Sequence, residues 1–161
     1  MEKIFDKNLK SDYDSESDTL KHIKRVNQLL INAAIELLER AKKHDDSKLG
    51  VNEKPFFDIY TPKLKDCTFG SDEYYEHLKG LDVALKHHYK NNSHHPQYYD
   101  NGVNGMNLFD LIEMFVDWKA ASERHSDGDI LKSIEINKSR FGISEQICEI
   151  FKNTVNLLDI P

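Results

Sequence analysis

The chain has 161 residues, of which 39% are hydrophobic and 31% charged, and its formal net charge is −6. This length suits one domain with a buried core, and the composition is typical of a soluble globular protein. The negative charge argues against general nucleic-acid binding, which requires a basic surface. Cys67 and Cys148 form neither a CxxC motif nor a zinc-binding spacing, and they predict a reducing, cytoplasmic location.

The first fifteen residues are predicted to be a polar N-terminal arm, because their apolar residues are few and scattered. They contain no apolar run that could serve as the core of a signal peptide. We expect residues 16–161 to form one helical domain. No later apolar run is long enough to span a bilayer, so no membrane partner is expected.

Hydrophobic periodicity predicts an all-α bundle of about six or seven helices. Apolar residues recur every three or four positions from Leu20 to Ala41, which predicts a first helix that ends near residue 44. Two glycines and two prolines punctuate residues 49–70, so this region is predicted to be irregular. Ser71 is the predicted N-cap of a second helix, and His88 lies on the apolar face of that helix.

Three more helices are predicted after a loop at residues 91–106, which is rich in Asn and Gly. These helices cover approximately residues 107–124, 129–141 and 144–158. No segment alternates between apolar and polar residues for long enough to predict a strand.

The adjacent residues His44 and Asp45 are the first candidates for chemistry. Together they can place one imidazole nitrogen and one carboxylate oxygen on the same divalent metal. Lys48, three residues after the Asp, would then meet a phosphate bound to that metal. The alternative is a pair of ordinary polar residues at a helix C-terminus, where the helix dipole favours a histidine.

A dense group of histidines follows, at His87, His88, His94 and His95. A single inward-facing histidine is more often a satisfied core residue than a ligand. Four histidines within nine residues instead indicate contact with a metal or a phosphate. Imidazoles mixed with carboxylates do not select among zinc, iron, nickel, cobalt and manganese.

Three acidic residues, Asp110, Glu113 and Asp117, lie close together around the helix predicted at residues 107–124. They form either a solvated acidic stripe or a set of carboxylates directed at partners. The second interpretation gains support because this helix is apolar over most of its circumference, and an unpaired buried charge is costly.

His22 presents a geometric difficulty. In one straight helix it would lie about 33 Å from His44, whereas the ligands of one metal lie within a few ångströms of one another. Either His22 is not a ligand or the chain reverses between the two histidines. The place for such a reversal is Asn32-Ala33-Ala34, where Asn32 is compatible with a turn.

In their order along the chain, these residues resemble the HD-domain metal-dependent phosphohydrolases, an all-helical superfamily. The resemblance is carried by four blocks over residues 18–125: His22-Ile23-Lys24-Arg25-Val26, His44 to Lys48, His87-His88 through Asn92 to His94-His95, and Glu113-Met114 with Asp117-Trp118. The chain is most similar to a bacterial and phage-related branch that has no assigned reaction.

The resemblance implies a metal site whose ligands are His22, His44, Asp45 and Asp117, and it therefore implies the chain reversal. The implied catalytic residues are Asp45, Lys48, His88 and His95. The candidates for phosphate contact or for a second metal are His87, His88, Asn92, His94 and His95. The residues expected to orient the ligands from behind are Asp46 and Glu113. The sequence lacks a Glu directly after His87-His88, which some binuclear relatives carry.

The implied function is hydrolysis of a small phosphorylated substrate, with a nucleotide as the expected substrate, by water activated on a divalent ion (Mn, Fe, Co, Ni, Zn or Mg). Lys48 would neutralise charge on the phosphoryl oxygens, and His88 or His95 would protonate the leaving oxygen. Glycine-rich nucleotide cradles are absent from the sequence. The aromatic residues that either stack on a base or pack in the core are Tyr89, Tyr98, Tyr99 and Trp118.

Two other classes of function remain open from the sequence. One is an iron protein of the same fold that oxidises its substrate with dioxygen. The other is a non-catalytic module that binds a metal or a nucleotide. The sequence also leaves the oligomeric state open, and a homo-oligomer is compatible with it.

Overall fold

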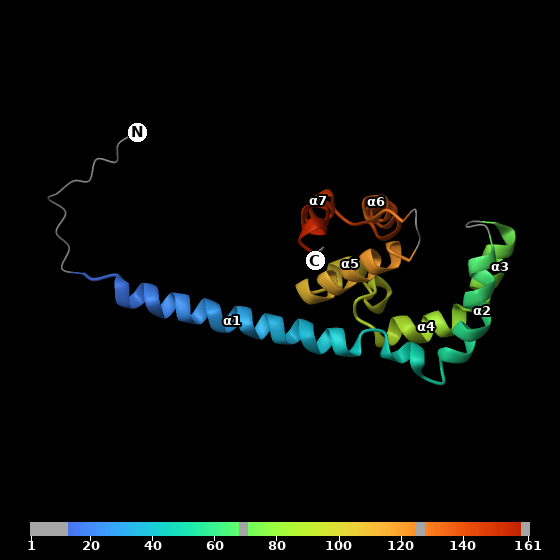
Figure 1. Ribbon diagram of the computed structural model, residues 1–161, viewed down its shortest axis with the longest axis horizontal. Helices are drawn as coiled ribbons and strands as arrows, with labels where there is room; N and C mark the ends of the chain where they lie inside the picture. The colour runs from blue at the N-terminus through green and yellow to red at the C-terminus, as the bar shows by residue number, and fades with distance from the viewer. Residues whose placement is uncertain (1–12, 68–70, 125–127, 159–161) are drawn as a thin grey trace. The chain divides into compact units, whose positions relative to one another are not determined.

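The computed structural model describes residues 13–67, 71–124 and 128–158. These residues contain seven α-helices and no β-strand, which confirms the predicted all-α fold (Figure 1). Residues 1–12 of the predicted arm and residues 68–70 of the predicted irregular region lie outside the described residues. The chain divides into two compact units, residues 1–38 and residues 39–161. None of the described helices is long and apolar enough to cross a membrane.

Helix α1 runs without a break from Glu16 to Lys43, as its apolar periodicity predicts. Acidic residues occupy its first turn and basic residues its last turn, where each sign complements the helix dipole. The helix continues through Asn32, so the predicted reversal at this point is wrong. A single Asn is a weak helix breaker, and the two alanines that follow it are strong helix formers.

Helix α2 (Lys54–Asp66) occupies most of the region that was predicted to be irregular, which corrects that prediction. Pro55 stands in the first turn, where the N–H that proline lacks has no partner within the helix. The ring of Tyr60 packs so closely on Gly80 that a Cβ there would lie 2.2 Å from it. This packing against the next helix outweighs the local helix-breaking signal of Pro62.

The predicted second helix is divided in two at Leu81, which gives α3 (Asp72–Gly80) and α4 (Asp82–Asn91). The side chain of Ser71 accepts a hydrogen bond from the backbone N–H of Tyr74, so the predicted N-cap is confirmed. Because of the division, α4 takes its own direction and carries its last turn to the candidate site.

The core of the second unit lies between α5 (Leu108–Ser122), α6 (Ile130–Phe141) and α7 (Glu145–Thr154) (Figure 1). Its buried side chains are Met114, Phe115, Ile134, Ile143, Cys148 and Phe151. The ring of Trp118 stacks on Phe141 against this core. Of the two roles predicted for Trp118, core packing is therefore the one that the structure shows. One face of α5 packs in this core, and its opposite face reaches the candidate site.

Candidate metal centre

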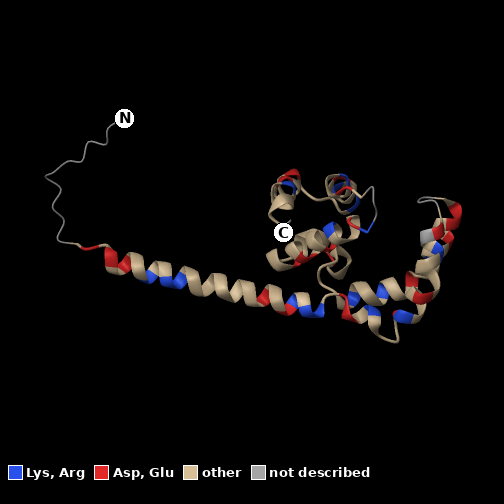
Figure 2. Ribbon diagram, viewed as in Figure 1, with Lys and Arg blue, Asp and Glu red and all other residues tan. Residues whose placement is uncertain are grey.

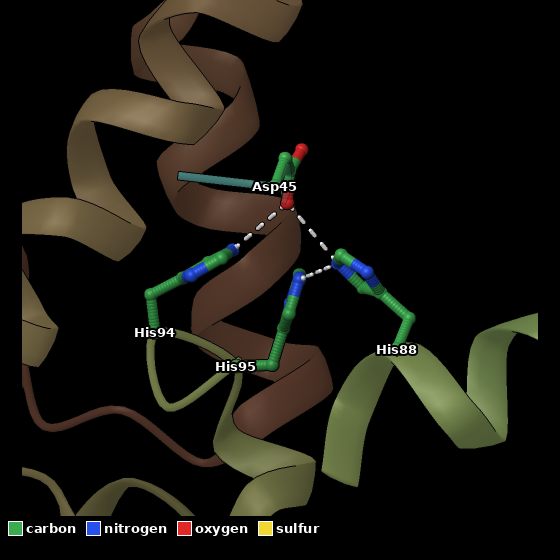
Figure 3. A group of neighbouring side chains, drawn as sticks. All are labelled: Asp45, His88, His94 and His95. Carbon is green, nitrogen blue, oxygen red and sulfur yellow. Dashed lines mark hydrogen bonds and ion pairs between the residues drawn. The ribbon is translucent and has the colours of Figure 1, made fainter. Parts of the chain in front are cut away.

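Asp45 stands at the turn between α1 and the short 3-10 helix η1 (Asp46–Leu49). Its backbone is left-handed, with φ of 60°, and no other non-glycine residue in the described ranges has a positive φ. Asp and Asn tolerate this conformation better than most residues, because their short polar side chains can bond locally. The turn directs the carboxylate of Asp45 toward His88 and His94 (Figure 3).

Asp45, His88, His94 and His95 form a group whose potential ligand atoms all lie within 4.8 Å of one another (Figure 3). The Oδ1 atom of Asp45 lies 3.2 Å from Nε2 of His88 and 3.6 Å from Nε2 of His94. Nε2 of His88 lies 2.8 Å from Nε2 of His95. His88 and His94 are only 1% and 2% exposed. Four potential ligands therefore converge on one small, largely buried volume.

Three histidines around Asp45 direct Nε2 toward it, and a carboxylate contacts the Nδ1 atom of each. Nδ1 of His88 lies 2.9 Å from Glu53, and Nδ1 of His94 lies 3.1 Å from Glu113. Glu113 also lies 2.9 Å from Nδ1 of His44. When Nδ1–H of a neutral imidazole donates a hydrogen bond to a carboxylate, Nε2 carries the free lone pair. Carboxylates behind the imidazole rings in this way are a usual feature of metal-binding histidines.

Glu53 is fully buried at the start of α2, and the sequence analysis missed it. Its two carboxylate oxygens lie 2.7 Å from Nδ1 of His87 and 2.9 Å from Nδ1 of His88. Burial alone would raise the pKa of Glu53, but contacts with His87, Ser47 and His88 hold it below its ordinary value. The available signal was Pro55, which marks a helix start, because the dipole at that start favours a carboxylate such as that of Glu53.

Two buried polar atoms in the group have no hydrogen-bond partner among the described residues, namely Oδ1 of Asp45 and Nε2 of His94. They face each other across 3.6 Å. Buried polar atoms in native proteins are nearly always satisfied. A divalent cation coordinated by both atoms would satisfy them, and the mixture of imidazole and carboxylate ligands suits a first-row transition metal. The residues of this group therefore fit a metal ion.

A second potential metal-binding group, His44, Asp45 and Asp117, shares Asp45 with the first. Nε2 of His44 lies 3.5 Å from Oδ2 of Asp45 and 3.7 Å from Oδ1 of Asp117. One carboxylate oxygen of Asp45 thus faces His88 and the other faces His44. A carboxylate with its two oxygens placed in this way can bridge a pair of metal ions.

His22 does not belong to any potential metal-binding group in the described part of the chain. It lies in the first unit, on the continuous helix α1. The helical rise alone separates it from residue 44 by about 33 Å along that helix. The structure therefore brings together three of the four implied ligands within one chain, and it does not bring His22 to them.

The other predicted residues divide into those near the ligands and those farther out. Lys48 lies beside both groups, with its Nζ 2.5 Å from Oδ2 of Asp45. The side-chain amide of Asn92 donates hydrogen bonds to Ser47 Oγ and to the backbone carbonyl of His88, both at 2.8 Å, and so ties η1 to α4. Asp46 is exposed, and Glu53 and Glu113 occupy the orienting positions behind the histidines.

Electrostatic contacts set the charge of His44. The carboxylate of Asp117 and then that of Glu113 raise the pKa of His44 to about 10, although burial acts in the opposite direction. The metal-free site therefore carries a protonated imidazole at neutral pH. A metal ion that binds His44 must displace this proton.

Asp45 and His95 have shifted pKa values for different reasons. Burial would raise the pKa of Asp45, but His88 and Lys48 hold it below its ordinary value. Burial, together with the neighbouring His94 and His88, lowers the pKa of His95 to about 3. The site thus presents an ionised carboxylate and a neutral imidazole, which are the protonation states that a metal ion requires.

Asp110, the first acid of the α5 stripe, has a structural role. It is fully buried and accepts hydrogen bonds from Arg40 at 2.8 Å, Ser93 at 2.7 Å and Tyr99 at 2.6 Å. It also completes a capping box with Asn107 at the start of α5. The acids of this helix therefore have different roles. Asp110 stabilises the fold, whereas Glu113 and Asp117 face the candidate metal centre.

Comparison with known proteins assigns most of the chain to a family. The model of a family of unknown function, DUF5662, matches residues 11–157. No curated protein and no solved structure matches the chain. The chemistry must therefore be inferred from the arrangement of side chains around Asp45.

Proposed function

The chain belongs to the DUF5662 family, and we propose that it is a metal-dependent phosphohydrolase acting on a small phosphorylated substrate such as a nucleotide. One observation carries the proposal: imidazole Nε2 atoms converge on Asp45, and carboxylates hold the Nδ1 atoms of His88 and His94 behind them. The order of the motifs, which resembles that of HD-domain phosphohydrolases, supports hydrolysis over other metal chemistry.

Asp45, His88, His94 and His95 would hold one divalent ion, and the open group of His44, Asp45 and Asp117 would hold a second. A bound ion supplies Lewis acidity, which polarises a phosphoryl group and lowers the pKa of water. The carboxylates of Glu53 and Glu113 hold the histidine rings in place, so little reorganisation is needed when the ion binds.

Lys48 supplies a positive charge next to the ligands. Its side chain is 35% exposed, so the ammonium group lies where a substrate from solvent can meet it. A fixed cation in this position neutralises negative charge that accumulates on phosphoryl oxygens. We assign to Lys48 the recognition of the transferred phosphoryl group.

The proton donor to the leaving oxygen depends on how many ions the site holds. Both ring nitrogens of His88 are engaged, and His95 stays neutral because its pKa is lowered to about 3, so neither is suited to donate a proton. His44 is 30% exposed and its pKa is raised, which suits a general acid. If the site holds one ion, His44 would be the donor; if it holds two, His44 would be a ligand of the second.

Elemental analysis of the purified protein, combined with a phosphate-release screen over nucleotides with added Mn, Co, Ni and Mg, tests the proposal. The decisive variant is Asp45→Asn, since Asn tolerates the left-handed backbone and removes only the charge. The matched control is Asp46→Asn, one residue along and exposed. We expect Asp45→Asn to lose metal and to lower activity about 100-fold or more.

Three results would contradict the proposal. If Asp45→Asn keeps both its metal and its activity, the assignment of the metal centre to the residues around Asp45 is wrong. Redox-active iron without phosphate release would favour the dioxygen-dependent alternative. A strongly metal-dependent melting temperature without turnover of any nucleotide would favour a binding module.

A further inference from the structure

A further group of potential ligands lies where α2 ends and α3 begins. Cys67, the C-cap of α2, and Glu73 and His77 on α3 place their potential ligand atoms within 4.8 Å of one another. This group shares no residue with the groups around Asp45. Among the potential metal-binding groups of the described residues, it is the one that contains a cysteine.

The packing of α3 on α2 brings these three side chains together. The ring of Tyr60, in the middle of α2, packs on Gly80 at the end of α3, and its centroid lies 6.4 Å from that of the His77 ring. The two helices therefore run in opposite directions, and the end of α2 with Cys67 meets the start of α3 with Glu73. Because the cysteines have no zinc-binding spacing in the sequence, the group depends on this packing.

Glu73 and His77 are spaced for an ion between them. They are four residues apart on α3, so they project from neighbouring positions on one face of the helix. Oε1 of Glu73 lies 3.8 Å from Nε2 of His77, which is too long for a hydrogen bond. Two ligands of one tetrahedral zinc ion, at bonds of about 2.0–2.3 Å, lie roughly 3.3–3.8 Å apart. The observed separation is close to this value.

The charges around Cys67 favour a cation and oppose a reactive thiol. Figure 2 shows acidic residues in the first turn of α3, where Asp72 and Glu73 lie. Burial, and then the negative charges of Glu73 and Asp66, raise the pKa of the Cys67 thiol. Nucleophilic cysteines lie in electropositive surroundings that lower this pKa, so the role of a nucleophile does not fit. A metal ion would reverse the effect, because a coordinated thiol loses its proton.

We propose that Cys67, Glu73 and His77 bind a thiophilic divalent ion such as Zn²⁺, which joins the end of α2 to the first two turns of α3. One thiolate, one imidazole and one carboxylate are all ligands that zinc accepts. The thiolate distinguishes this site from the candidate metal centre, whose ligands are imidazoles and carboxylates. The side chain of Glu73 is 75% exposed, so solvent reaches the ion and supplies the fourth ligand. The site does not rest on the proposed function.

Cobalt tests the site, because a thiolate bound to Co²⁺ gives a charge-transfer band in the near ultraviolet that imidazole and carboxylate ligands do not give. Cys148 is fully buried in the core and belongs to no potential metal-binding group of the described residues, so the band reports on Cys67. We expect the reduced full chain to develop this band, with the amplitude of one thiolate per chain, on titration with Co²⁺. Added Zn²⁺ should remove it.

Substitutions identify the ligands. Cys67→Ser should lose the band. Glu73→Gln and His77→Gln should each weaken the binding of Co²⁺ about tenfold or more, since even the loss of a residue behind a ligand costs about 10- to 100-fold. The matched control is Glu76→Gln, on the same helix, where the exposed Glu76 pairs with Lys79; it should keep the wild-type affinity.

The outcomes separate this site from the candidate metal centre. Asp45→Asn should keep the band. Zinc that is retained by Asp45→Asn and lost from Cys67→Ser would support the site, whatever the phosphate-release screen gives. A wild-type protein without the band, or a band that persists in Cys67→Ser, would overturn the proposal. Unchanged Co²⁺ affinity in both Glu73→Gln and His77→Gln would show an adduct of a single thiol and would equally overturn it.

Discussion

The buried carboxylate of Glu53 lies 2.9 Å from Nδ1 of His88, across a sequence separation of 35 residues. Because Glu53 is ionised and can only accept, Nδ1 donates the hydrogen bond, and the other ring nitrogen, Nε2, lies on the side of Asp45, 3.2 Å from its Oδ1. One glutamate at the start of α2 thus fixes the orientation of a histidine on α4. The orientation of His88 for metal binding therefore depends on the packing of α2 against α4.

Replacing Glu53 by Gln should loosen this orientation without changing the size of the side chain. We expect metal affinity to fall about 10- to 100-fold, the usual effect of losing a carboxylate behind a metal-binding histidine. Chelator competition measures the affinity. Asp58→Asn, on an exposed part of the same helix, is the control. Equal affinity in the wild type and Glu53→Gln would contradict the assigned role.

Arg40→Met should destabilise the second unit. Asp110 is fully buried, and Arg40 is its cationic partner at 2.8 Å, so the substitution leaves a buried carboxylate without its counter-charge. Loss of one partner of a buried pair costs about 3–5 kcal/mol of unfolding free energy. Urea denaturation measures this change. Lys42→Met, which removes an exposed pair with Glu39, should change the unfolding free energy by less than about 1 kcal/mol.

The stability of the metal-free protein should fall as the solution becomes alkaline. The pKa of His44 is raised to about 10 by Asp117 and Glu113. The folded state therefore holds the proton more tightly than the unfolded state. This contribution to stability is complete below about pH 6.5 and disappears as the pH rises through about 10.

Melting temperatures in EDTA between pH 6 and pH 10 test this dependence. The difference between the wild type and His44→Gln should be largest at pH 6 and should shrink toward pH 10. A difference that stays constant over this range would show that the proton on His44 does not stabilise the fold.

Metal uptake should both stabilise the protein and release protons. A ligand present at 100 times its dissociation constant stabilises the folded state by about 2.7 kcal/mol. If the ion engages His44, the proton held there at neutral pH must leave. Calorimetric titration in two buffers of different ionisation enthalpy measures the number of protons released. Uptake without proton release would assign His44 to the general-acid role.

Local sequence signals predicted the parts of the fold that depend on local chemistry. The apolar period gave the extent of α1, and Ser71 caps a helix where its hydroxyl suggested one. His88 points inward, as expected from its place on an apolar face, and is 1% exposed. Each of these features is decided by residues within a few positions of one another.

The features that were missed depend on contacts between distant residues. Helix α2 forms in spite of Pro62 because Tyr60 packs on Gly80 of the next helix. The role of Glu53 appears only when α2 is folded against α4. The implied place of His22 beside His44 came from family resemblance, and the one turn-compatible residue, Asn32, does not interrupt α1.

Asp45 contributes to the molecule through both its backbone and its side chain. Its left-handed backbone forms the turn between the end of α1 and η1. Its side chain belongs to both potential metal-binding groups of the candidate metal centre. An ion that immobilises this carboxylate also restricts the φ and ψ angles of the turn. Metal loading is thereby coupled to backbone order, and we expect slower amide hydrogen exchange at residues 45–50 in the metal-loaded protein than in the metal-free protein.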